Sequence, residues 1–365
     1  MSTTATAGAG ERAGARRTER IPVAVLGATG SVGQRFVQLL EHHPWFRLHE
    51  AVASERSAGK PYGDAADWRL ESLMPSSAAG LMVKKLGDEL ESRLLFSGLD
   101  SSVAGEAEDD YANRGAVVVS NSRNHRMDAD VPLLIPELNA EHLDAVELQQ
   151  KRRGSRGYII TNPNCSTVGL AMAIAPLHRK WGVTQLHVTT MQAISGAGYN
   201  GVASYAILDN VIPYIGSEEE KIESEPRKIL GDWKNGRFTD AEFRISAQTN
   251  RVGTIDGHLM TISLKLAQTP LFEELRPAFE SFTGEPQRLG LPSAPKQPIH
   301  FAEEKDRPQT RLDRDRENGM AVTVGRVRPC NLLDVRMVAL VHNTIRGAAG
   351  AALLNAELLE ARGML

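Results

Sequence analysis

Cys165 stands where a cysteine can act as a nucleophile. It lies in the segment 162–168, between the apolar runs 157–160 and 169–174, a pattern that predicts a strand, a tight turn and a helix with the thiol at the helix start. First-turn N–H groups have no partner within the helix, and the helix dipole places partial positive charge there. We therefore expect a lowered thiol pKa and a nucleophilic side chain. The ordinary alternative is a small buried core residue, because free cysteines are often buried.

Two groups of candidate residues follow the cysteine in the chain. Gln192 leads into a glycine-rich turn that contains Ser195 and Gly196, where the backbone could approach a cofactor ring. Glu218 and Lys221 lie in a charged run whose ordinary interpretation is a solvated helix face. Without other context, that ordinary interpretation would prevail.

Arg251 and His258 form a third group. They are seven residues apart, which would place them on opposite faces of an alternating strand, but Gly253 and Gly257 allow a bend between them. A lone histidine is more often a satisfied surface or core residue than a catalyst. A histidine together with a candidate thiolate and a nucleotide-binding loop indicates acid/base chemistry.

A glycine-rich loop joins the first predicted strand to the first predicted helix. Its glycines follow a GxxGxxG spacing rather than the GxGxxG of the standard dinucleotide fingerprint. Glycines there allow a tight turn and let the backbone approach a pyrophosphate at the helix N-terminus. The spacing alone is a weak signal, because any strand–helix turn can carry glycines. The position of this loop near the start of the fold, with a strand before it and a helix after it, supports the prediction of a dinucleotide site. The predicted cofactor-binding residues are Gly27, Thr29, Gly30, Ser31, Val32 and Gly33.

The loop after the second predicted strand favours NADP over NAD. An acidic residue at this place binds the ribose of NAD, whereas an arginine accommodates the 2′-phosphate of NADP. Glu55 is present, so NAD is not excluded, but Ser54, Arg56 and Ser57, with Lys60 nearby, favour NADP. The ordinary alternative is a solvated polar loop.

Strands alternate with helices in the first half of the chain, which indicates βαβ units and an α/β, Rossmann-type, doubly wound domain. The predicted strands there are 21–26, 48–53, 94–97 and 116–120. After the cysteine the strands become longer and the helices fewer, which indicates an α+β second domain, with strands at 186–192, 259–266 and 320–328. The final segment, 343–362, is helical by propensity.

The length of 365 residues suits two domains. We expect a disordered tail at 1–20 and a dinucleotide-binding domain at 21–164, completed by a C-terminal helix within 343–365. The remaining residues, 165–342, would form a catalytic and dimerisation domain.

Composition argues against several classes of protein. A net charge of −3 shows no basic excess, so nothing favours a nucleic-acid partner. There is no apolar stretch of about 18 residues that could cross a membrane. The first twenty residues contain no secretory signal, although their arginines leave an organelle transit peptide open. Two cysteines do not make a disulfide framework, and neither CxxC nor HExxH occurs, so we expect a cytoplasmic protein without a metal.

In combination these motifs resemble the aspartate-β-semialdehyde dehydrogenases, in particular the branch found in archaea and fungi. The resemblance runs from Ile21 to the C-terminal helix, and the tail before it does not belong to the pattern. It is carried by the loop 27–33, the segment 162–165, Gln192 with the turn 195–198, the segment 210–215 and the stretch 251–258.

The resemblance implies reversible, NADPH-dependent reductive dephosphorylation of L-aspartyl-4-phosphate to aspartate semialdehyde and phosphate. This reaction is a step toward lysine, methionine and threonine. The resemblance also implies a homodimer or homotetramer. The chemistry fits a cysteine, because a thioester accepts hydride better than an oxygen ester would.

Carried over residue by residue, the resemblance makes Cys165 the nucleophile and His258 the acid/base. Gln192 would orient the acyl group. Arg251 would hold the α-carboxylate of the substrate, since its planar guanidinium binds carboxylates with two hydrogen bonds. Glu218 would hold the amino group.

The phosphate would be held by Lys221 and Arg126, with Arg123 as the alternative to Arg126. Asn164 completes the implied substrate-binding set. The implied cofactor-binding set gains Ser195, Gly196 and Asn343.

Other functions remain in view. Malonyl-CoA reductase and N-acetyl-glutamyl-phosphate reductase share the cofactor fold and a thioester mechanism. The pair of Glu218 and Lys221 argues against N-acetyl-glutamyl phosphate as the substrate, because an acylated amine has no charge for Glu218 to pair with. Malonyl-CoA is harder to exclude. A cysteine protease would leave the glycine loop unexplained, and a catalytically silent NADP-binding regulator would not need Cys165 with His258.

Overall fold

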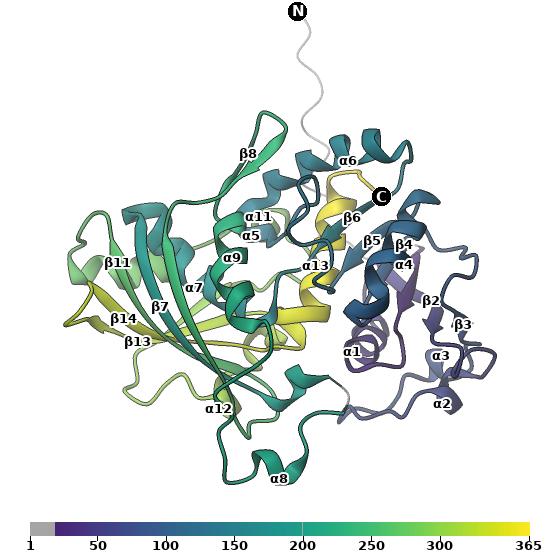
Figure 1. The fold of residues 1–365 in the computed structure, drawn as a ribbon, viewed down its shortest axis with the longest axis horizontal. Helices are drawn as coiled ribbons and strands as arrows, with labels where there is room; N and C mark the ends of the chain where they lie inside the picture. The colour runs from purple at the N-terminus through teal and green to yellow at the C-terminus, as the bar shows by residue number, and fades with distance from the viewer. Residues whose placement is uncertain (1–18, 199) are drawn as a thin grey trace, which may run out of the picture.

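The computed structural model describes residues 19–198 and 200–365. The tail predicted at 1–20 therefore lies, up to residue 18, outside the described residues. Two six-stranded sheets stand side by side, the parallel one on the right of Figure 1 and the mixed one on the left. Helices pack between and around them.

The first sheet is parallel throughout, in the order β3-β2-β1-β4-β5-β6. Its last three strands are short, largely apolar and buried, as parallel strands covered by helices are. This is the doubly wound order, so the predicted Rossmann-type fold is confirmed. The strands are β1 (Ile21–Leu26), β2 (Phe46–Ala53), β3 (Lys84–Lys85), β4 (Leu94–Ser97), β5 (Val117–Ser120) and β6 (Tyr158–Thr161).

Helices cover both faces of the parallel sheet and follow its strands in the chain. Ligands of such sheets bind outside the carboxyl ends of the strands, where the strand order reverses; here that point lies between β1 and β4. The longer helices are α1 (Ser31–Leu40), α4 (Ser101–Asn113) and α6 (Ala145–Arg153). The short elements of this half are α2 (Tyr62–Ala65), α3 (Ser76–Ala79), α5 (Pro136–Asn139) and η1 (Ala140–Asp144).

The second sheet is mixed, in the order β10-β7-β11-β14-β13-β12. One face packs against α7 (Cys165–Trp181), whose middle is buried on all sides in the core of this half. The helix α9 (Glu218–Ile229) packs on both α7 and β10. The strands are β7 (Val183–Gln192), β10 (Arg244–Arg251), β11 (His258–Leu266), β12 (Ile299–Ala302), β13 (Val322–Pro329) and β14 (Val335–Val341).

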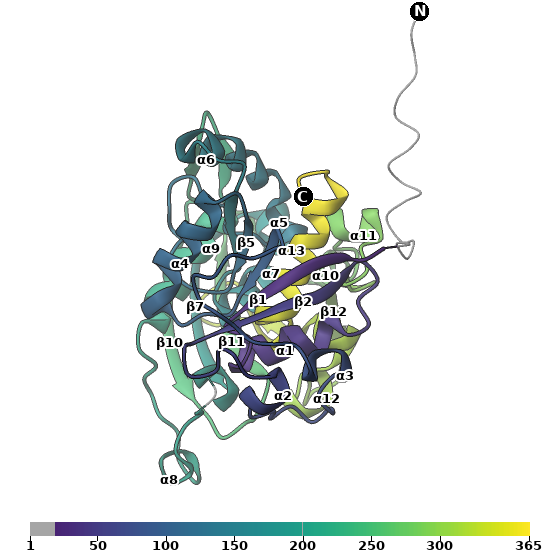
Figure 2. The same ribbon diagram turned by 90° about the vertical axis from the view of Figure 1, so that its right-hand side faces the viewer.

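The predicted helix 343–362 begins later than the sequence suggests. A single wide turn, η5 (Ile345–Ala349), precedes the regular helix α13 (Gly350–Ala361). This helix packs in the same core as β1, β4 and β5, and Figure 2 shows it behind β1 and β2. The end of the chain is thus built into the first half.

The remaining elements are small. Figure 1 shows the helix α8 at the tip of a loop that projects from the mixed sheet. None of the helices among residues 19–198 and 200–365 is long and apolar enough to cross a membrane. These small elements are η2 (Ile194–Ala197), α8 (Ser204–Ile207), β8 (Asp232–Lys234), β9 (Arg237–Thr239), η3 (Phe272–Glu274), α10 (Leu275–Glu280), α11 (Glu285–Leu289), α12 (Thr310–Asp313) and η4 (Arg316–Gly319).

Candidate active site

Cys165 is the first residue of α7, as the sequence predicts, and it follows β6 after a three-residue connection. Asn164 caps the helix: its side-chain oxygen accepts hydrogen bonds from the backbone N–H groups of Ser166 at 2.9 Å and Thr167 at 3.3 Å. The wide turn η5 passes directly over the cysteine, because a Cβ at Gly347 would lie only 2.7 Å from the Cβ of Cys165. The thiol is therefore fixed between a capped helix end and a close backbone.

His258 faces this thiol from the start of β11. Its Nε2 lies 3.2 Å from Sγ of Cys165, and the histidine is fully buried. On the other side of the ring, the backbone N–H of Ala193 donates a hydrogen bond of 3.0 Å to Nδ1. The bend that brings His258 close to Arg251 includes Gly257 at a φ of 98°, a conformation that favours glycine.

The resting charge of the pair differs from the sequence expectation. Burial raises the pKa of the Cys165 thiol to about 12, and the Glu218 carboxylate adds to the rise. Burial, assisted by the charge of Arg251, lowers the pKa of His258 to about 3. The pair thus rests as thiol and neutral imidazole, and the predicted lowering of the thiol pKa is wrong. The helix terminus is outweighed because this helix begins in the interior, where loss of water disfavours a thiolate.

Glu218 lies at the centre of the polar contacts near the thiol. Its carboxylate accepts from Nδ2 of Asn164 at 3.0 and 2.9 Å, from Nε2 of Gln192 at 3.2 Å and from Nζ of Lys221 at 2.7 Å. Glu218 and Lys221 share the first turn of α9, so the charged run is not simply a solvated face. Four predicted residues from three separate parts of the chain are thereby brought together.

Arg251 lies at the end of β10, and its Nη1 donates a 2.7 Å hydrogen bond to the carbonyl of Ala193. The turn at Gly196 lies against the same groups, since a Cβ there would come within 2.9 Å of Nη1 of Arg251 and 3.2 Å of Cε1 of His258. A side chain at that place would have to displace the Arg251 guanidinium. Asn343 anchors this turn with two hydrogen bonds. Its side-chain N–H donates to Oγ of Ser195 at 2.8 Å, and its side-chain oxygen accepts from the N–H of Gly257 at 2.8 Å.

Arg126 is buried, whereas Arg123 is exposed, so the geometry favours Arg126 of the two arginines considered for phosphate. Nη1 of Arg126 donates a hydrogen bond of 2.9 Å to Glu225, and Nη2 of Arg126 donates one of 2.7 Å to the carbonyl of Asn121. The other oxygen of Glu225 accepts a hydrogen bond of 2.7 Å from the backbone N–H of Asn164. Glu225 thus joins the arginine to the cysteine helix, a link that sequence reasoning missed.

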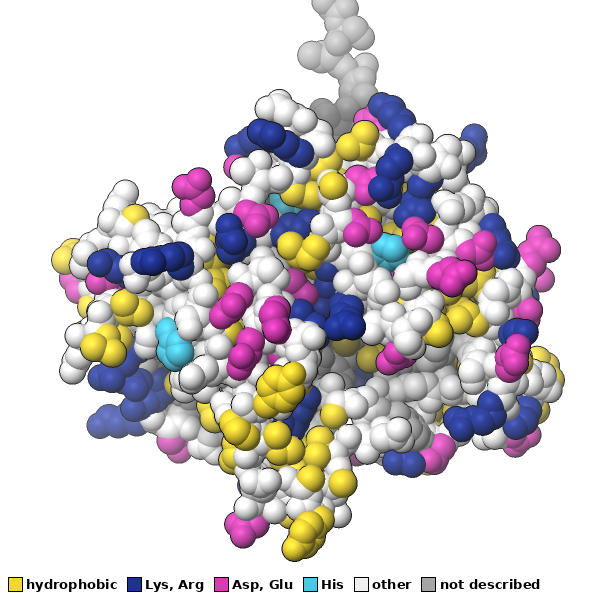
Figure 3. All heavy atoms as spheres, in the orientation of Figure 1, with side chains coloured by type: hydrophobic (Ala, Val, Ile, Leu, Met, Phe, Trp, Pro, Cys, Tyr) yellow, Lys and Arg dark blue, Asp and Glu magenta, His cyan; other side chains and the backbone are white. Residues whose placement is uncertain are grey.

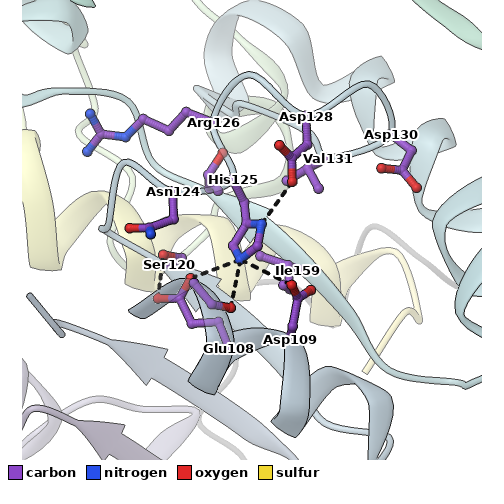
Figure 4. A network of polar contacts seen from close by, with 12 residues as sticks. Glu108, Asp109, Ser120, Asn124, His125, Arg126, Asp128, Asp130, Val131 and Ile159 are labelled. Atoms are coloured by element: carbon purple, nitrogen blue, oxygen red, sulfur yellow. Dashed lines mark hydrogen bonds and ion pairs between the residues drawn. The ribbon is translucent and has the colours of Figure 1, made fainter. Parts of the chain in front are cut away.

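The loop that carries Arg126 is anchored on its other side by a second polar network (Figure 4). His125 hydrogen bonds to Asp128 at 2.8 Å and lies 3.9 Å from the buried Glu108, whose other oxygen accepts from Ser120. Figure 4 shows Arg126 pointing away from His125. Of these two neighbouring residues, His125 anchors the loop, whereas Arg126 points toward the candidate site.

Lys228 is a further residue that the sequence analysis did not single out. It is buried on α9, and its Nζ donates to the carbonyls of Arg126, Asp128 and Val131 at 2.8, 2.8 and 2.9 Å. Burial lowers the pKa of Lys228 to about 8. The three carbonyls fix the loop to the helix that carries Glu218 and Glu225.

The glycine loop forms a cradle of backbone. Gly27 has a φ of 74°, and a Cβ there would lie 2.8 Å from the carbonyl oxygen of Gly98. A Cβ at Gly33 would lie 2.1 Å from the carbonyl oxygen of Gly27, so α1 and the loop can pack this closely only with glycine. No side chain caps the start of α1 at Gly30, and its first turn holds no acidic residue. A pyrophosphate fits such a helix end.

The other predicted cofactor residues surround this cradle. Ser31 opens α1, the carbonyl of Thr29 accepts 3.1 Å from the side chain of Gln34, and Val32 packs beside Gly98. After β2, the carbonyl of Ser54 accepts from the N–H of Ser57 at 2.9 Å, which closes a turn with Arg56 exposed at its tip.

The acidic residue of this turn points elsewhere. Glu55 pairs with Lys85, and the two side chains are mostly exposed. Within residues 19–198 and 200–365 there is no cluster of His, Cys, Asp and Glu side chains that could hold a metal ion.

A doubly wound sheet with a glycine cradle, joined to a mixed sheet whose histidine faces a cysteine at the start of a packed helix, is the architecture of a dinucleotide-dependent dehydrogenase with a reactive cysteine. Two family models match the chain: "Semialdehyde dehydrogenase, NAD binding domain" over residues 22–146 and "Semialdehyde dehydrogenase, dimerisation domain" over residues 174–346.

Individual relatives of the chain belong to the same family as these models indicate. The chain is 48% identical to an aspartate-semialdehyde dehydrogenase of Methanothermobacter thermautotrophicus, over 93% of this chain and 99% of that protein. It is 48% identical to one of Schizosaccharomyces pombe, over 94% and 99%. The solved structure of the Candida albicans aspartate semialdehyde dehydrogenase with NADP matches with a TM-score of 0.88 and 45% identity, over 95% of this chain and 100% of that one. The chain belongs to the aspartate-semialdehyde dehydrogenase family, as its motifs predict.

Proposed function

We propose that this protein is an NADP-dependent, phosphorylating aspartate-semialdehyde dehydrogenase. In the biosynthetic direction it would convert L-aspartyl-4-phosphate to aspartate semialdehyde and phosphate through a thioester on Cys165. The observation that carries this proposal is the set of charged and polar side chains around the thiol: His258 lies 3.2 Å from Sγ, Arg251 lies beside His258 at the turn of Gly196, and Glu218 binds both Asn164 and Lys221.

The charges of the substrate match these side chains. Aspartyl phosphate carries a phosphate, an α-carboxylate and an ammonium group. Arg251 is the proposed partner of the carboxylate, Glu218 of the ammonium, and Lys221 with Arg126 of the phosphate. Arginine suits carboxylate and phosphate because its fork of N–H groups binds two oxygens at once. Gln192, bonded to Glu218, lies where it can orient the acyl group.

The covalent step uses only groups of this chain and the substrate. As the Cys165 sulfur attacks the acyl carbon, its proton passes to His258, an S–C bond forms, and the C–O bond to phosphate breaks. NADPH, when bound, supplies the hydride that turns the thioester into the aldehyde. Breaking the C–S bond then releases the aldehyde and a thiolate, which takes back the proton from His258 and so restores the cysteine.

NADP is the proposed cofactor, since the solved Candida albicans structure is a complex with NADP and the residues here suit it. The cradle at Gly27, Gly30 and Gly33 would hold the pyrophosphate. Arg56, exposed at the tip of its turn, would reach the 2′-phosphate, while Glu55 is engaged with Lys85. Ser195, Gly196 and Asn343 would lie at the nicotinamide end.

Malonyl-CoA reduction is the alternative activity. Malonyl-CoA has a carboxylate but no ammonium group, so Glu218 would face an uncompensated negative charge in that complex. A substrate panel with purified protein decides between the two. We expect phosphate-dependent oxidation of aspartate semialdehyde with NADP to be the best activity, and faster reduction of malonyl-CoA at saturating NADPH would overturn the proposal.

We further propose a cytoplasmic homodimer or homotetramer. The second half of the chain matches a dimerisation domain. Large apolar side chains are exposed on the projecting loop around α8, at the lower edge of Figure 3: Tyr205, Leu208, Val211 and Tyr214. Sedimentation analysis of the parent and of a Leu208→Glu, Val211→Glu variant tests the assembly, and a parent that sediments as a monomer at micromolar concentration would contradict it.

A further inference from the structure

Three charged side chains of α9 share one face of that helix. Glu218, Lys221 and Glu225 follow one another at a spacing of three and four residues, which places them on one stripe of an α-helix. Glu218 and Lys221 are the proposed partners of the ammonium group and of the phosphate. Glu225 is the buried carboxylate of this stripe and has no proposed role so far. Because a buried carboxylate needs partners, its contacts indicate what it does.

The Glu225 carboxylate has one partner on each side. Oε1 accepts a hydrogen bond of 2.9 Å from Nη1 of Arg126, and Oε2 accepts one of 2.7 Å from the backbone N–H of Asn164, the residue before Cys165. Glu225 is 2% exposed and Arg126 is 7% exposed, so the two charges meet away from water. A single side chain therefore joins a proposed phosphate ligand to the start of the cysteine helix.

The contacts of Arg126 fix the plane of its guanidinium. Nη2 donates a hydrogen bond of 2.7 Å to the carbonyl of Asn121, so a carboxylate and a carbonyl hold the two terminal nitrogens. Nε is buried and has no hydrogen-bond partner in the described part of the chain. A guanidinium has more N–H groups than these two contacts use, and it binds anions through parallel pairs of them. The arginine is thus held from one side and keeps donors for a ligand.

We propose that Glu225 is a positioning residue for the phosphate step, because it holds the Arg126 guanidinium in the orientation that binds phosphate. This inference rests on the proposed function, in which phosphate is the ligand of Arg126. In this role Glu225 acts through the arginine rather than on the substrate. Lys228, on the same helix, donates to the carbonyl of Arg126 at 2.8 Å. The helix α9 therefore holds both the backbone and the side chain of this arginine.

Glu225→Gln should disturb the two contacts of the carboxylate unequally. The amide has one oxygen and one nitrogen, so it can accept from only one of the two donors and must turn an N–H group toward the other. The backbone of Asn164 is fixed between β6 and α7, whereas the side chain of Arg126 can rotate. We therefore expect the amide oxygen to keep the contact with Asn164 and the guanidinium to be displaced.

Oxidation of aspartate semialdehyde with NADP at varied inorganic phosphate measures this displacement. In Glu225→Gln we expect the apparent KM for phosphate to rise by about tenfold to a hundredfold, the value of one hydrogen bond to a charged group. The KM for NADP should stay near that of the parent. An unchanged KM for phosphate would overturn the proposal.

Glu223→Gln is the matched control for this variant. Glu223 lies on the same helix, but its carboxylate accepts a hydrogen bond of 2.9 Å from the backbone N–H of Ala247 on β10. The exchange of carboxylate for amide is the same, and Arg126 keeps its partner. We expect the KM for phosphate of Glu223→Gln to equal that of the parent. A rise as large as in Glu225→Gln would contradict the proposal.

The phosphate-free half of the reaction separates positioning from a general loss of structure. Acylation of Cys165 by aspartate semialdehyde and NADP uses no phosphate, so the first NADPH should form in Glu225→Gln at nearly the parent rate. Only the subsequent reaction with phosphate should be slow. Equal slowing of both steps would show that Glu225 supports the cysteine helix as a whole, which would refute a specific role in phosphate binding.

A double-mutant cycle tests whether Glu225 acts through the arginine. Arg126→Met should raise the KM for phosphate by itself. Adding Glu225→Gln should raise it little further, because the guanidinium that Glu225 positions is gone. Two effects that simply multiply would show that the residues act independently, and the proposal would fall.

Glu225→Asp provides a second variant that keeps the negative charge. Its shorter side chain cannot reach both Arg126 and Asn164, so the KM for phosphate should rise here as well, and a parent-like value would contradict the proposal. The outcome for the parent separates this inference from the proposed function. A parent that needs no phosphate refutes the proposed function. A parent that needs phosphate, with Glu225→Gln and Glu223→Gln alike, refutes only the role of Glu225.

Discussion

The cofactor end and the catalytic centre of this molecule are built in different ways. The cofactor cradle consists of backbone: a methyl group on Gly33 would collide with the carbonyl of Gly27, and one on Gly27 with the carbonyl of Gly98. The catalytic centre consists of side chains from α7, β7, α9, β10 and β11, joined by buried hydrogen bonds. Added atoms should therefore damage the first site, whereas removed atoms should damage the second.

The most severe loss is expected at the nucleophile. Cys165→Ala should abolish turnover, because no thioester can form, while NADPH binding at the glycine cradle stays intact. Steady-state kinetics and titration of NADPH fluorescence measure the two properties separately. Cys330→Ala is the matched control and should turn over like the parent; substantial turnover in Cys165→Ala would end the thioester proposal.

His258→Asn should be the next most severe change. Turnover should fall by about two to four orders of magnitude, the usual range for a positioned proton-handling group. Substrate affinity should change less, since the carboxylate and phosphate partners remain. A rate and pH profile equal to those of the parent would show that His258 has no part in the chemistry.

Gly33→Ala tests whether the glycine cradle has room for an added methyl group. Its new methyl group would lie 2.1 Å from the carbonyl oxygen of Gly27, so loop and helix must separate. Overpacking of this kind costs about 1–3 kcal/mol, which we expect as lost stability and weaker NADPH binding. Gly80→Ala adds the same methyl group where nothing lies within 4 Å and should be neutral in both denaturation and binding. Equal behaviour of the two variants would mean that the loop tolerates side chains.

The smallest effect is expected at the exposed edge of the cofactor site. Arg56→Ala should weaken NADPH binding by about tenfold to a hundredfold, the value of one charge-assisted contact. NADH should be nearly unaffected because it lacks the 2′-phosphate. If both cofactors weaken equally in parallel titrations, Arg56 supports the loop rather than the phosphate.

The cradle could be predicted from sequence because its determinants are local. A strand, three glycines and a helix within 21–40 suffice to indicate a nucleotide loop, and the helix start at Cys165 follows from its immediate neighbours in the same way. The contacts of the catalytic centre depend on distant segments. Glu225 contacts Arg126 across 99 positions, and no pattern near either residue announces the pair.

Burial is the second property that local patterns did not supply. The dipole argument for Cys165 is correct in kind, but the interior position of the helix start raises the thiol pKa instead. Likewise, the contact between the Ala193 backbone and His258 depends on how β7 and β11 pair, and a backbone N–H leaves no mark in a sequence.

The central claim is a thioester on Cys165 that phosphate resolves, and a phosphate-free reaction tests it most directly. Enzyme mixed rapidly with aspartate semialdehyde and NADP, without phosphate, should form one NADPH per active site and stop, with the acyl group on Cys165 detectable by peptide mass spectrometry. Adding phosphate should start continuous turnover. Continuous NADPH formation without phosphate, or no acylated Cys165 after the burst, would contradict the claim.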